Sequence, residues 1–398
     1  MTTATTQRCF RSFFLGGFES SSHRRRDGRR LDLLAGTKHD RFVSEDYAAL
    51  RQHDILTVRD GLRWHLIETA PGRYDWASFL PMLRAAEAGG MQVVWDLCHY
   101  GWPDDLDIWS PAFVDRFARF AAAAAAVVRD ESDDPPHYCA VNEISYWAWA
   151  GGEVGRINPC AHGEGGRLKH QLARAAVAAT RAIRDVDRRA RFVTAEPLIH
   201  VEPGLGDAEH LRRAELYRLS QFEALDLLTG RLEPSLGGDP DLVDVVGLNF
   251  YPDNQWYFGG STIPMGHQAF RPLREMLAEA HARCGRPLLL AETGAEGTAR
   301  TAWLHYVAGE VHAARKAGVP VEGICIYPVL DYPGWENERV CEVGLLSGAN
   351  ELGRRRVCSG FARELRRQQV IFANARANRA RRRRFLPWTA PASSVAAE

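Results

Sequence analysis

Short apolar runs alternate with longer amphipathic segments along most of the chain. Runs such as VVWDL, DVVGLNF and PLLLA are almost continuously apolar, which is typical of parallel strands covered on both faces by helices. Eight strand-like runs occur, at 10–18, 55–60, 91–98, 137–141, 190–195, 243–251, 286–291 and 321–327. Helical patterns separate them, for example at 76–88, 111–128, 168–186, 208–228, 270–283 and 301–317. Eight strand–helix units predict an α/β protein with a (β/α)8 TIM barrel.

The alternation ends near Phe372, where the composition changes. Residues 373–398 are rich in arginine and then in proline, alanine and serine, and they offer little apolar surface to pack. We therefore expect a short N-terminal lead over 1–9, a single barrel domain over 10–372 and a basic, disordered tail over 373–398.

The composition excludes several classes of partner. The 50 basic residues are balanced by 50 acidic residues, which argues against a nucleic-acid partner. No apolar run approaches the ~20 residues of a membrane span, so no membrane partner is expected. The eight cysteines form no CxxC pair, and the N-terminus does not have the pattern of a signal peptide, so we expect reduced thiols and a cytoplasmic protein. No glycine-rich phosphate loop or metal-ligand spacing occurs, so neither an organic cofactor nor a metal is expected. The oligomeric state stays open.

Polar residues end most of the strand-like runs, where side chains of a barrel meet at its functional face. They include two glutamates on opposite strands, Glu143 after the fourth run and Glu292 after the seventh. Carboxylates on opposite strands suit glycosidic bond cleavage, because one group donates a proton while the other attacks the sugar or activates water. The further candidates for substrate binding at strand ends are Arg59, His99, Asn142, Asn249, Tyr251 and Tyr327.

Several segments resemble glycoside hydrolase clan A. VNEI at 141–144 resembles the Asn-Glu of the clan's fourth strand, and LLLAETG at 288–294 resembles its nucleophile strand. Within the clan the chain is most similar to family 1, the β-glucosidases. The segments FFLGGFESS at 13–21, TVRDGLRW at 57–64, DLCHYGWPDDL at 96–106, VGLNFYP at 246–252 and GICIYPVLDYPGW at 323–335 follow the order of that family's strands.

The resemblance implies a role for each candidate. Glu143 would be the general acid/base and Glu292 the nucleophile. Arg59 and Tyr251 would keep Glu292 ionised, and a guanidinium beside a carboxylate does favour its charged form. The remaining implied contacts are those of Asn142 with the sugar 2-hydroxyl, His99 with the 3-hydroxyl, and Tyr327 and Trp335 with the sugar faces. Glu196, a third carboxylate at a strand end, receives no catalytic role and is expected to be an ion-pair or hydrogen-bond partner.

Two positions depart from the family pattern. Arg24 stands where the family has a glutamine that binds sugar hydroxyls, and Gly334 stands where it has a glutamate before the tryptophan matched to Trp335. One interpretation is that the arginines around Arg24 bind a carboxylate or phosphate on the sugar. The alternative is that they form a solvated loop, and that His23 or Glu336 supplies the missing contacts.

These patterns predict a retaining β-glycosidase, an O-glycosidase of the β-glucosidase type. It would hydrolyse a small-molecule or oligosaccharide β-glycoside by double displacement through a covalent glycosyl-enzyme intermediate. Two alternatives remain open: a transglycosidase with the same fold, and a barrel that binds carbohydrate without turnover. Two carboxylates opposite one another argue against the last, since binding alone needs no acid facing a nucleophile.

Overall fold

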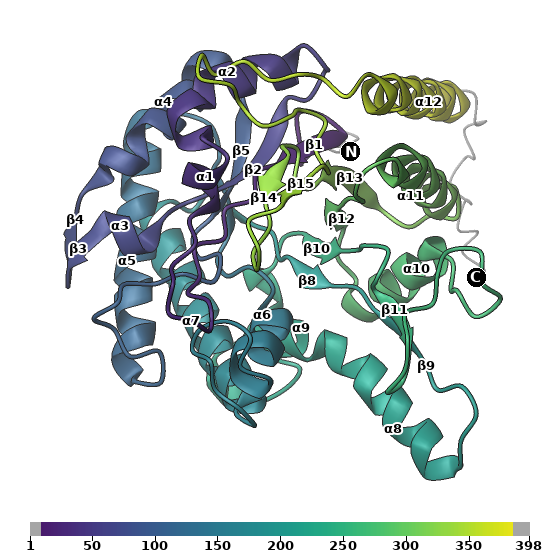
Figure 1. The fold of residues 1–398 in the computed structure, drawn as a ribbon, viewed down its shortest axis with the longest axis horizontal. Helices are drawn as coiled ribbons and strands as arrows, with labels where there is room; N and C mark the ends of the chain where they lie inside the picture. Colours follow the sequence, from purple (N-terminus) through teal and green to yellow (C-terminus); the bar gives the residue numbers. More distant parts are fainter. Residues whose placement is uncertain (1–8, 385–398) are drawn as a thin grey trace, which may run out of the picture.

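The computed structural model describes residues 9–384 and consists of a parallel β-barrel inside a ring of helices (Figure 1). The barrel strands are β1 (Phe14–Gly17), β2 (Thr57–Gly61), β5 (Gln92–Asp96), β6 (His137–Cys139), β7 (Arg191–Phe192), β8 (Glu196–Pro197), β10 (Val246–Asn249), β12 (Leu288–Thr293) and β13 (Val321–Ile326). Each coincides with, or touches, one of the eight predicted runs, so the predicted TIM barrel is confirmed.

The barrel closes through its fifth strand position, which is built from two short pieces. β7 pairs with β6, and β8 pairs with β10. Between the two pieces, Val193 forms a parallel bridge with Val245, and the Thr194 N–H donates to the carbonyl of Val245 at 3.1 Å. Since β1 pairs with both β2 and β13, the hydrogen-bonded ladder continues around the whole barrel.

Small side chains fill the barrel interior beneath the polar strand ends. Cys139, Ala195, Ala291 and Cys325 belong to one buried cluster with larger aliphatic residues. Above them, the ring of Tyr327 lies against Gly17, where an added Cβ would meet the ring at 2.1 Å. Glycine at the end of β1 is therefore required for Tyr327 to cover the barrel floor.

Long helices cover the outside of the barrel. They are α2 (His39–Arg51), α4 (Leu80–Gly89), α5 (Pro111–Glu131), α7 (Gly165–Val186), α10 (Leu273–Cys284), α11 (Ala299–Lys316) and α12 (Ser359–Arg384). Phe372 of α12 stacks on Phe13 with ring centroids 4.4 Å apart, so this helix packs on the start of β1. The helix continues to Arg384, beyond the domain boundary expected from the sequence. Residues 1–8 of the expected lead and 385–398 of the expected tail lie outside the described residues.

An insertion after strand position five extends the wall around the carboxyl ends of the strands. It contains α8 (Ala208–Leu219), which projects from the body in Figure 1, and β9 (His200–Glu202), which pairs with β11 (Gln255–Tyr257) from the segment after β10. The helix predicted over 208–228 is helical throughout, but the 3-10 turn Ser220–Phe222 divides it into α8 and α9 (Glu223–Leu228). The side chain of Gln221 in that turn accepts from the Ile199 N–H at 2.8 Å.

The remaining elements are short connections: α1 (Leu33–Gly36), α3 (Trp64–Ile67), β3 (Glu68–Ala70), β4 (Arg73–Tyr74), α6 (Ile144–Trp147), the π-helix Ala148–Glu153, β14 (Tyr332–Pro333) and β15 (Val340–Cys341). All eight cysteines are free thiols. Within 9–384, the helices are too short or too polar for any of them to traverse a lipid bilayer.

Candidate active site

Arg59 connects three strand ends at the floor of the barrel mouth. Its guanidinium donates two hydrogen bonds to Asp96, at 2.8 and 2.7 Å, one to Oε1 of Glu292 at 2.5 Å and one to Oδ1 of Asn142 at 2.5 Å. The side chain is buried, and its centre lies 5.3 Å from the ring centroid of Tyr327. A buried guanidinium with two carboxylate partners is fixed in position and fully charged.

Glu292 at the end of β12 is surrounded by groups that stabilise its negative charge. Arg59 binds Oε1, and the hydroxyl of Tyr251 donates to Oε2 at 2.9 Å. Burial raises the pKa of Glu292 above its ordinary value, while the charges of Arg59 and His99 oppose that rise. The direct guanidinium contact therefore favours the carboxylate form.

Glu143 has neutral partners only. Tyr100 Oη donates to Oε2 at 2.5 Å, and Asn249 Nδ2 donates to Oε1 at 2.9 Å. Burial, and next the charge of Glu292, raise the pKa of Glu143 to about 8. At neutral pH Glu143 is therefore mostly protonated, beside Glu292, whose ionised form is favoured by Arg59.

Both glutamates line one cavity of about 1140 Å³ at the carboxyl ends of the barrel strands. His99, Tyr251, Tyr327 and Trp335 line it as well, so six of the nine predicted site residues face a common space. The outer wall comes from the α6–α7 region, from the insertion and from β11, and it includes Trp149, Arg156, Lys169, Tyr217 and Trp256. A space of this size accommodates more than one sugar ring.

The barrel fold matches that of solved glycosidases. A family 1 β-glucosidase from Thermotoga maritima superimposes with a TM-score of 0.70 at 16% identity, covering 83% of this chain and 86% of the other. The fold of the present chain is that of the family 1 β-glucosidases. The AHE enzyme from Alicyclobacillus herbarius has a TM-score of 0.72 at 18% identity, with 84% and 87% of the two chains covered. A hyperthermophilic β-glucosidase mutant has a TM-score of 0.70 at 14% identity, over 89% and 98%.

The similarity is structural. No protein-family model matches the sequence, and no curated protein matches it. The predicted resemblance to family 1 is nonetheless confirmed for the fold, and it extends over most of the chain. In the described range 9–384, no group of three or more histidine, cysteine, aspartate or glutamate side chains is arranged to hold a metal ion.

Asn142 and Asn249 lie behind the cavity rather than in its wall. Both are completely buried. Nδ2 of Asn142 lies 2.9 Å from Nε2 of His99 and donates to Tyr100 Oη at 2.9 Å, while Asn249 donates to Glu143. In this structure the two amides orient the groups that line the cavity, and the expected contact of Asn142 with a sugar 2-hydroxyl stays a prediction.

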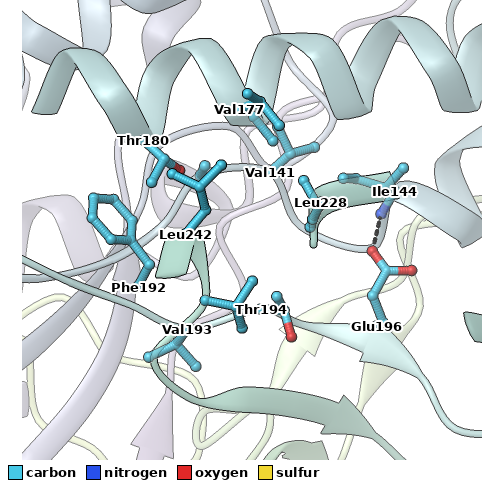
Figure 2. Close-up of a pocket in the computed structure, with 13 residues that line it drawn as sticks. Val141, Ile144, Val177, Thr180, Phe192, Val193, Thr194, Glu196, Leu228 and Leu242 are labelled. Atoms are coloured by element: carbon cyan, nitrogen blue, oxygen red, sulfur yellow. Dashed lines mark hydrogen bonds between the residues drawn. The ribbon is translucent and has the colours of Figure 1, made fainter. Parts of the chain in front are cut away.

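The backbone around Glu143 is held by Glu196. Glu143 has a positive φ of 42°, and its N–H donates to the carbonyl of Ala195 at 2.8 Å. The Glu196 carboxylate accepts from the next two N–H groups, those of Ile144 at 2.6 Å and Ser145 at 3.1 Å. Figure 2 shows Glu196 directed at Ile144 beside a small cavity of about 30 Å³ with largely apolar walls. Glu196 is thus a hydrogen-bond partner, as the sequence predicted.

Replacing Glu196 with glutamine is expected to impair catalysis by displacing Glu143. A glutamine has one carbonyl oxygen and cannot accept both N–H groups as a carboxylate does. A displacement of about 1 Å costs roughly 10- to 100-fold in rate. We expect this loss in kcat for substrates with poor leaving groups, with little change in KM.

Glu153→Gln is the matched control for this variant. Glu153 also accepts a backbone N–H, that of Gly165 at 3.2 Å, but at the start of α7. Glu196→Gln kinetics equal to those of Glu153→Gln for all leaving groups would show that Glu196 does not position Glu143.

The arginine-rich loop after β1, residues 24–30, lies outside the cavity. Arg24 Nε donates to Oδ1 of Asp104 at 2.9 Å, and Nη1 donates to the carbonyl of Gly28 at 2.7 Å. Glu336 pairs with Arg156 at 2.8 Å, and His23 packs on Trp335 with ring centroids 4.6 Å apart. Arg24 thus makes no contact inside the cavity, and the structure supports the solvated-loop alternative over an anion-binding role for this residue.

Three functional side chains received no role from the sequence: Asp96, Tyr100 and Glu19, although Tyr100 and Glu19 stand at expected strand ends. Asp96 orients Arg59, Tyr100 binds Glu143, and Glu19 lines the cavity. A signal existed for Asp96, because a single carboxylate interrupts the apolar run VVWDL. Tyr100 has a positive φ of 65°, and no feature of the sequence indicated this backbone turn toward Glu143.

Proposed function

We propose that this protein is a retaining β-glycosidase that hydrolyses β-O-glycosidic bonds, with Glu292 as nucleophile and Glu143 as general acid/base. The observation that carries the proposal is the contrast between two carboxyl groups in one cavity. Glu292 touches a guanidinium, whereas Glu143 has neutral donors and a pKa of about 8. Titratable groups whose environments separate their pKa values in this way are suited to act as base or nucleophile and as acid.

The first chemical step forms a covalent intermediate. A carboxylate oxygen of Glu292 attacks the anomeric carbon, and the bond between that carbon and the leaving oxygen breaks. Glu143 transfers its proton to the leaving oxygen, so the aglycone departs as a neutral alcohol. Arg59 and Tyr251 keep the nucleophile oriented, and Asn249 and Tyr100 orient the acid.

The second step releases the sugar. Glu143, now a carboxylate, takes a proton from a water molecule whose oxygen attacks the anomeric carbon. The bond to Glu292 breaks, and Glu292 leaves as a carboxylate. Two inversions at one carbon give net retention, for which the carboxyl groups of Glu143 and Glu292 should be ~5 to 5.5 Å apart.

We expect the ligands of this protein to resemble those of proteins with the same fold. A Thermotoga maritima β-glucosidase with the same fold holds glucoimidazole, and we expect this protein to bind that compound at the cavity floor. We also expect it to act in the cytoplasm, because its cysteines are free.

The proposal is tested by following the product of an aryl β-glycoside by proton NMR. Appearance of the β-anomer first, before mutarotation, supports double displacement, and first appearance of the α-anomer contradicts it. Added methanol distinguishes hydrolysis from glycosyl transfer, since a transglycosidase gives mainly the methyl β-glycoside. A non-catalytic barrel binds glucoimidazole but releases no aryl alcohol from any β-glycoside.

The activity should decline at high pH as Glu143 loses its proton. With a pKa of about 8, the acid is protonated below that pH and ionised above it, so kcat/KM should fall above about 8. The hydrogen bond from Tyr100 lowers the pKa of Glu143. Tyr100→Phe should therefore raise that pKa and move the alkaline limb of the pH profile to higher pH, by up to about one unit.

Tyr217→Phe provides the control for this pH shift. Tyr217 also lines the cavity, but on the wall formed by α8. An alkaline limb that moves equally in both variants, or moves downward in Tyr100→Phe, would mean that the limb does not report Glu143.

A further inference from the structure

Glu19, directly after β1, is a buried carboxylate with most of its hydrogen-bonding capacity unused. Glu19 is 7% exposed, and its side chain lines the floor of the cavity. Oε1 accepts the Ser21 N–H at 3.0 Å and lies 3.7 Å from Nε2 of His99. Among side chains in the described chain, none donates a hydrogen bond to Oε2. A carboxylate accepts up to about four hydrogen bonds, so Glu19 can take several from a ligand.

Two unpartnered donors belong to residues that line the same cavity. The hydroxyl of Tyr327 and the indole N–H of Trp335 are both buried without a hydrogen-bond partner in the described structure. Burial raises the pKa of the Tyr327 phenol, and the charge of Glu19 is the largest acidic contribution to that rise. The cavity wall therefore has unused acceptor atoms on Glu19 and unused donor groups on Tyr327 and Trp335. A sugar hydroxyl, which both donates and accepts, matches such a combination.

Among the described residues, each cation that faces the cavity or lies at its floor already has an acidic partner, which leaves none to receive an anionic sugar. Arg59 is occupied by Asp96 and Glu292. On the outer wall, Lys169 pairs with Glu223 at 2.5 Å and Arg156 pairs with Glu336. His99 lies between Asp96 and Glu19, and both raise its pKa against the effect of burial. A carboxylate or phosphate on the sugar would meet the Glu19 charge at close range.

We propose that Glu19 is a specificity-determining residue that accepts hydrogen bonds from the hydroxyl groups of an uncharged glycone, and that the site rejects uronic and phosphorylated sugars. This assignment rests on the proposed glycosidase function. Glu19 contacts the sugar away from the bond that breaks. It therefore selects the substrate and leaves the proton transfer to Glu143.

The first arm of the test uses the parent protein and needs no variant. Aryl β-glucoside, β-galactoside, β-glucuronide and 6-phospho-β-glucoside with the same leaving group are compared by kcat/KM. We expect the better neutral substrate to exceed both anionic ones by about 100-fold or more. An anionic glycoside that equals or exceeds the neutral ones overturns the assignment, while glycosidase activity itself stands.

The second arm identifies the contact with deoxy substrates. Glu19→Gln should lower kcat/KM for the best neutral glycoside by about 10- to 100-fold. The 3-, 4- and 6-deoxy forms of that substrate are then measured in both proteins. At the contacted position, the penalty for removing the hydroxyl should be large in the parent and below about threefold in Glu19→Gln, because the interaction is already lost.

Glu296→Gln is the matched control, since Glu296 lines the rim of the same cavity and pairs with Arg339 at the surface. Glu296→Gln removes one negative charge, as Glu19→Gln does, but it removes no contact with the sugar. The loss of kcat/KM on removing each hydroxyl should therefore be the same as in the parent. Identical penalties in the parent and in Glu19→Gln at all three positions overturn the assignment alone. Absence of turnover for every glycoside in the parent overturns the proposed function together with it.

Discussion

Replacing Glu292 with alanine is expected to abolish hydrolysis of every β-glycoside, whatever its leaving group. The variant lacks the oxygen that bonds to the anomeric carbon, and a better leaving group does not replace a missing nucleophile. It also leaves the Arg59 guanidinium with one carboxylate partner, Asp96. We expect a loss of roughly 10⁴-fold or more in kcat/KM, measured with aryl glycosides whose leaving-group pKa values span several units.

Added azide makes this result specific to the nucleophile. In Glu292→Ala, azide can enter the space left by the side chain and attack the anomeric carbon once, which gives the α-glycosyl azide from a β-glycoside. Glu296→Ala, four residues further along, should retain the activity of the parent. Formation of β-glycosyl azide by Glu292→Ala, or substantial residual hydrolysis, would remove Glu292 from the nucleophile role.

Replacing Glu143 with alanine is expected to give a loss that depends strongly on the leaving group. A leaving group of low pKa departs without protonation, so its glycosylation step should be largely intact. A leaving group of high pKa needs the proton from Glu143, and its kcat/KM should fall by roughly 10²- to 10⁴-fold. A plot of log kcat/KM against leaving-group pKa should therefore be much steeper for Glu143→Ala than for the parent.

The deglycosylation step provides the check on Glu143→Ala. Without the base, the glycosyl-enzyme accumulates, and azide, which needs no deprotonation, should accelerate its breakdown and give the β-glycosyl azide. Equal losses for all leaving groups would exclude Glu143 as the acid. The alkaline decline of the pH profile should also disappear from kcat/KM in this variant.

Much of the fold could be predicted because its signals are local. Buried parallel strands require apolar runs, and all eight runs became strands. The break between α8 and α9 has no such signal, since neither glycine nor proline lies near Gln221. At that break Gln221 accepts a hydrogen bond from Ile199, 22 residues earlier, a contact that no local pattern can indicate. Helix α12 continues beyond Phe372, where the folded domain was expected to end. Alanine and arginine favour helix even where little apolar surface is available.

The site was predictable to the level of strand ends and no further. Residue order shows that Arg59, Glu143 and Glu292 reach the same face of the barrel. Which side chains then enter the cavity depends on the local register, and the register shifts at Asn249 in β10 and between Leu290 and Thr293 in β12. Such irregularities re-aim side chains without any mark in the sequence.

The raised pKa of Glu143 has a consequence for heat resistance. A carboxyl group whose pKa rises from 4.5 to about 8 on folding destabilises the folded state, and the cost grows between those two pH values. Glu143→Gln should therefore melt a few degrees above the parent at pH 8 and at the same temperature as the parent at pH 4. Thermal unfolding at both pH values, with Glu153→Gln as control, measures the difference; a melting point that does not rise at pH 8 would contradict it. The variant without the proposed catalytic acid would then withstand heat better than the parent protein at pH 8.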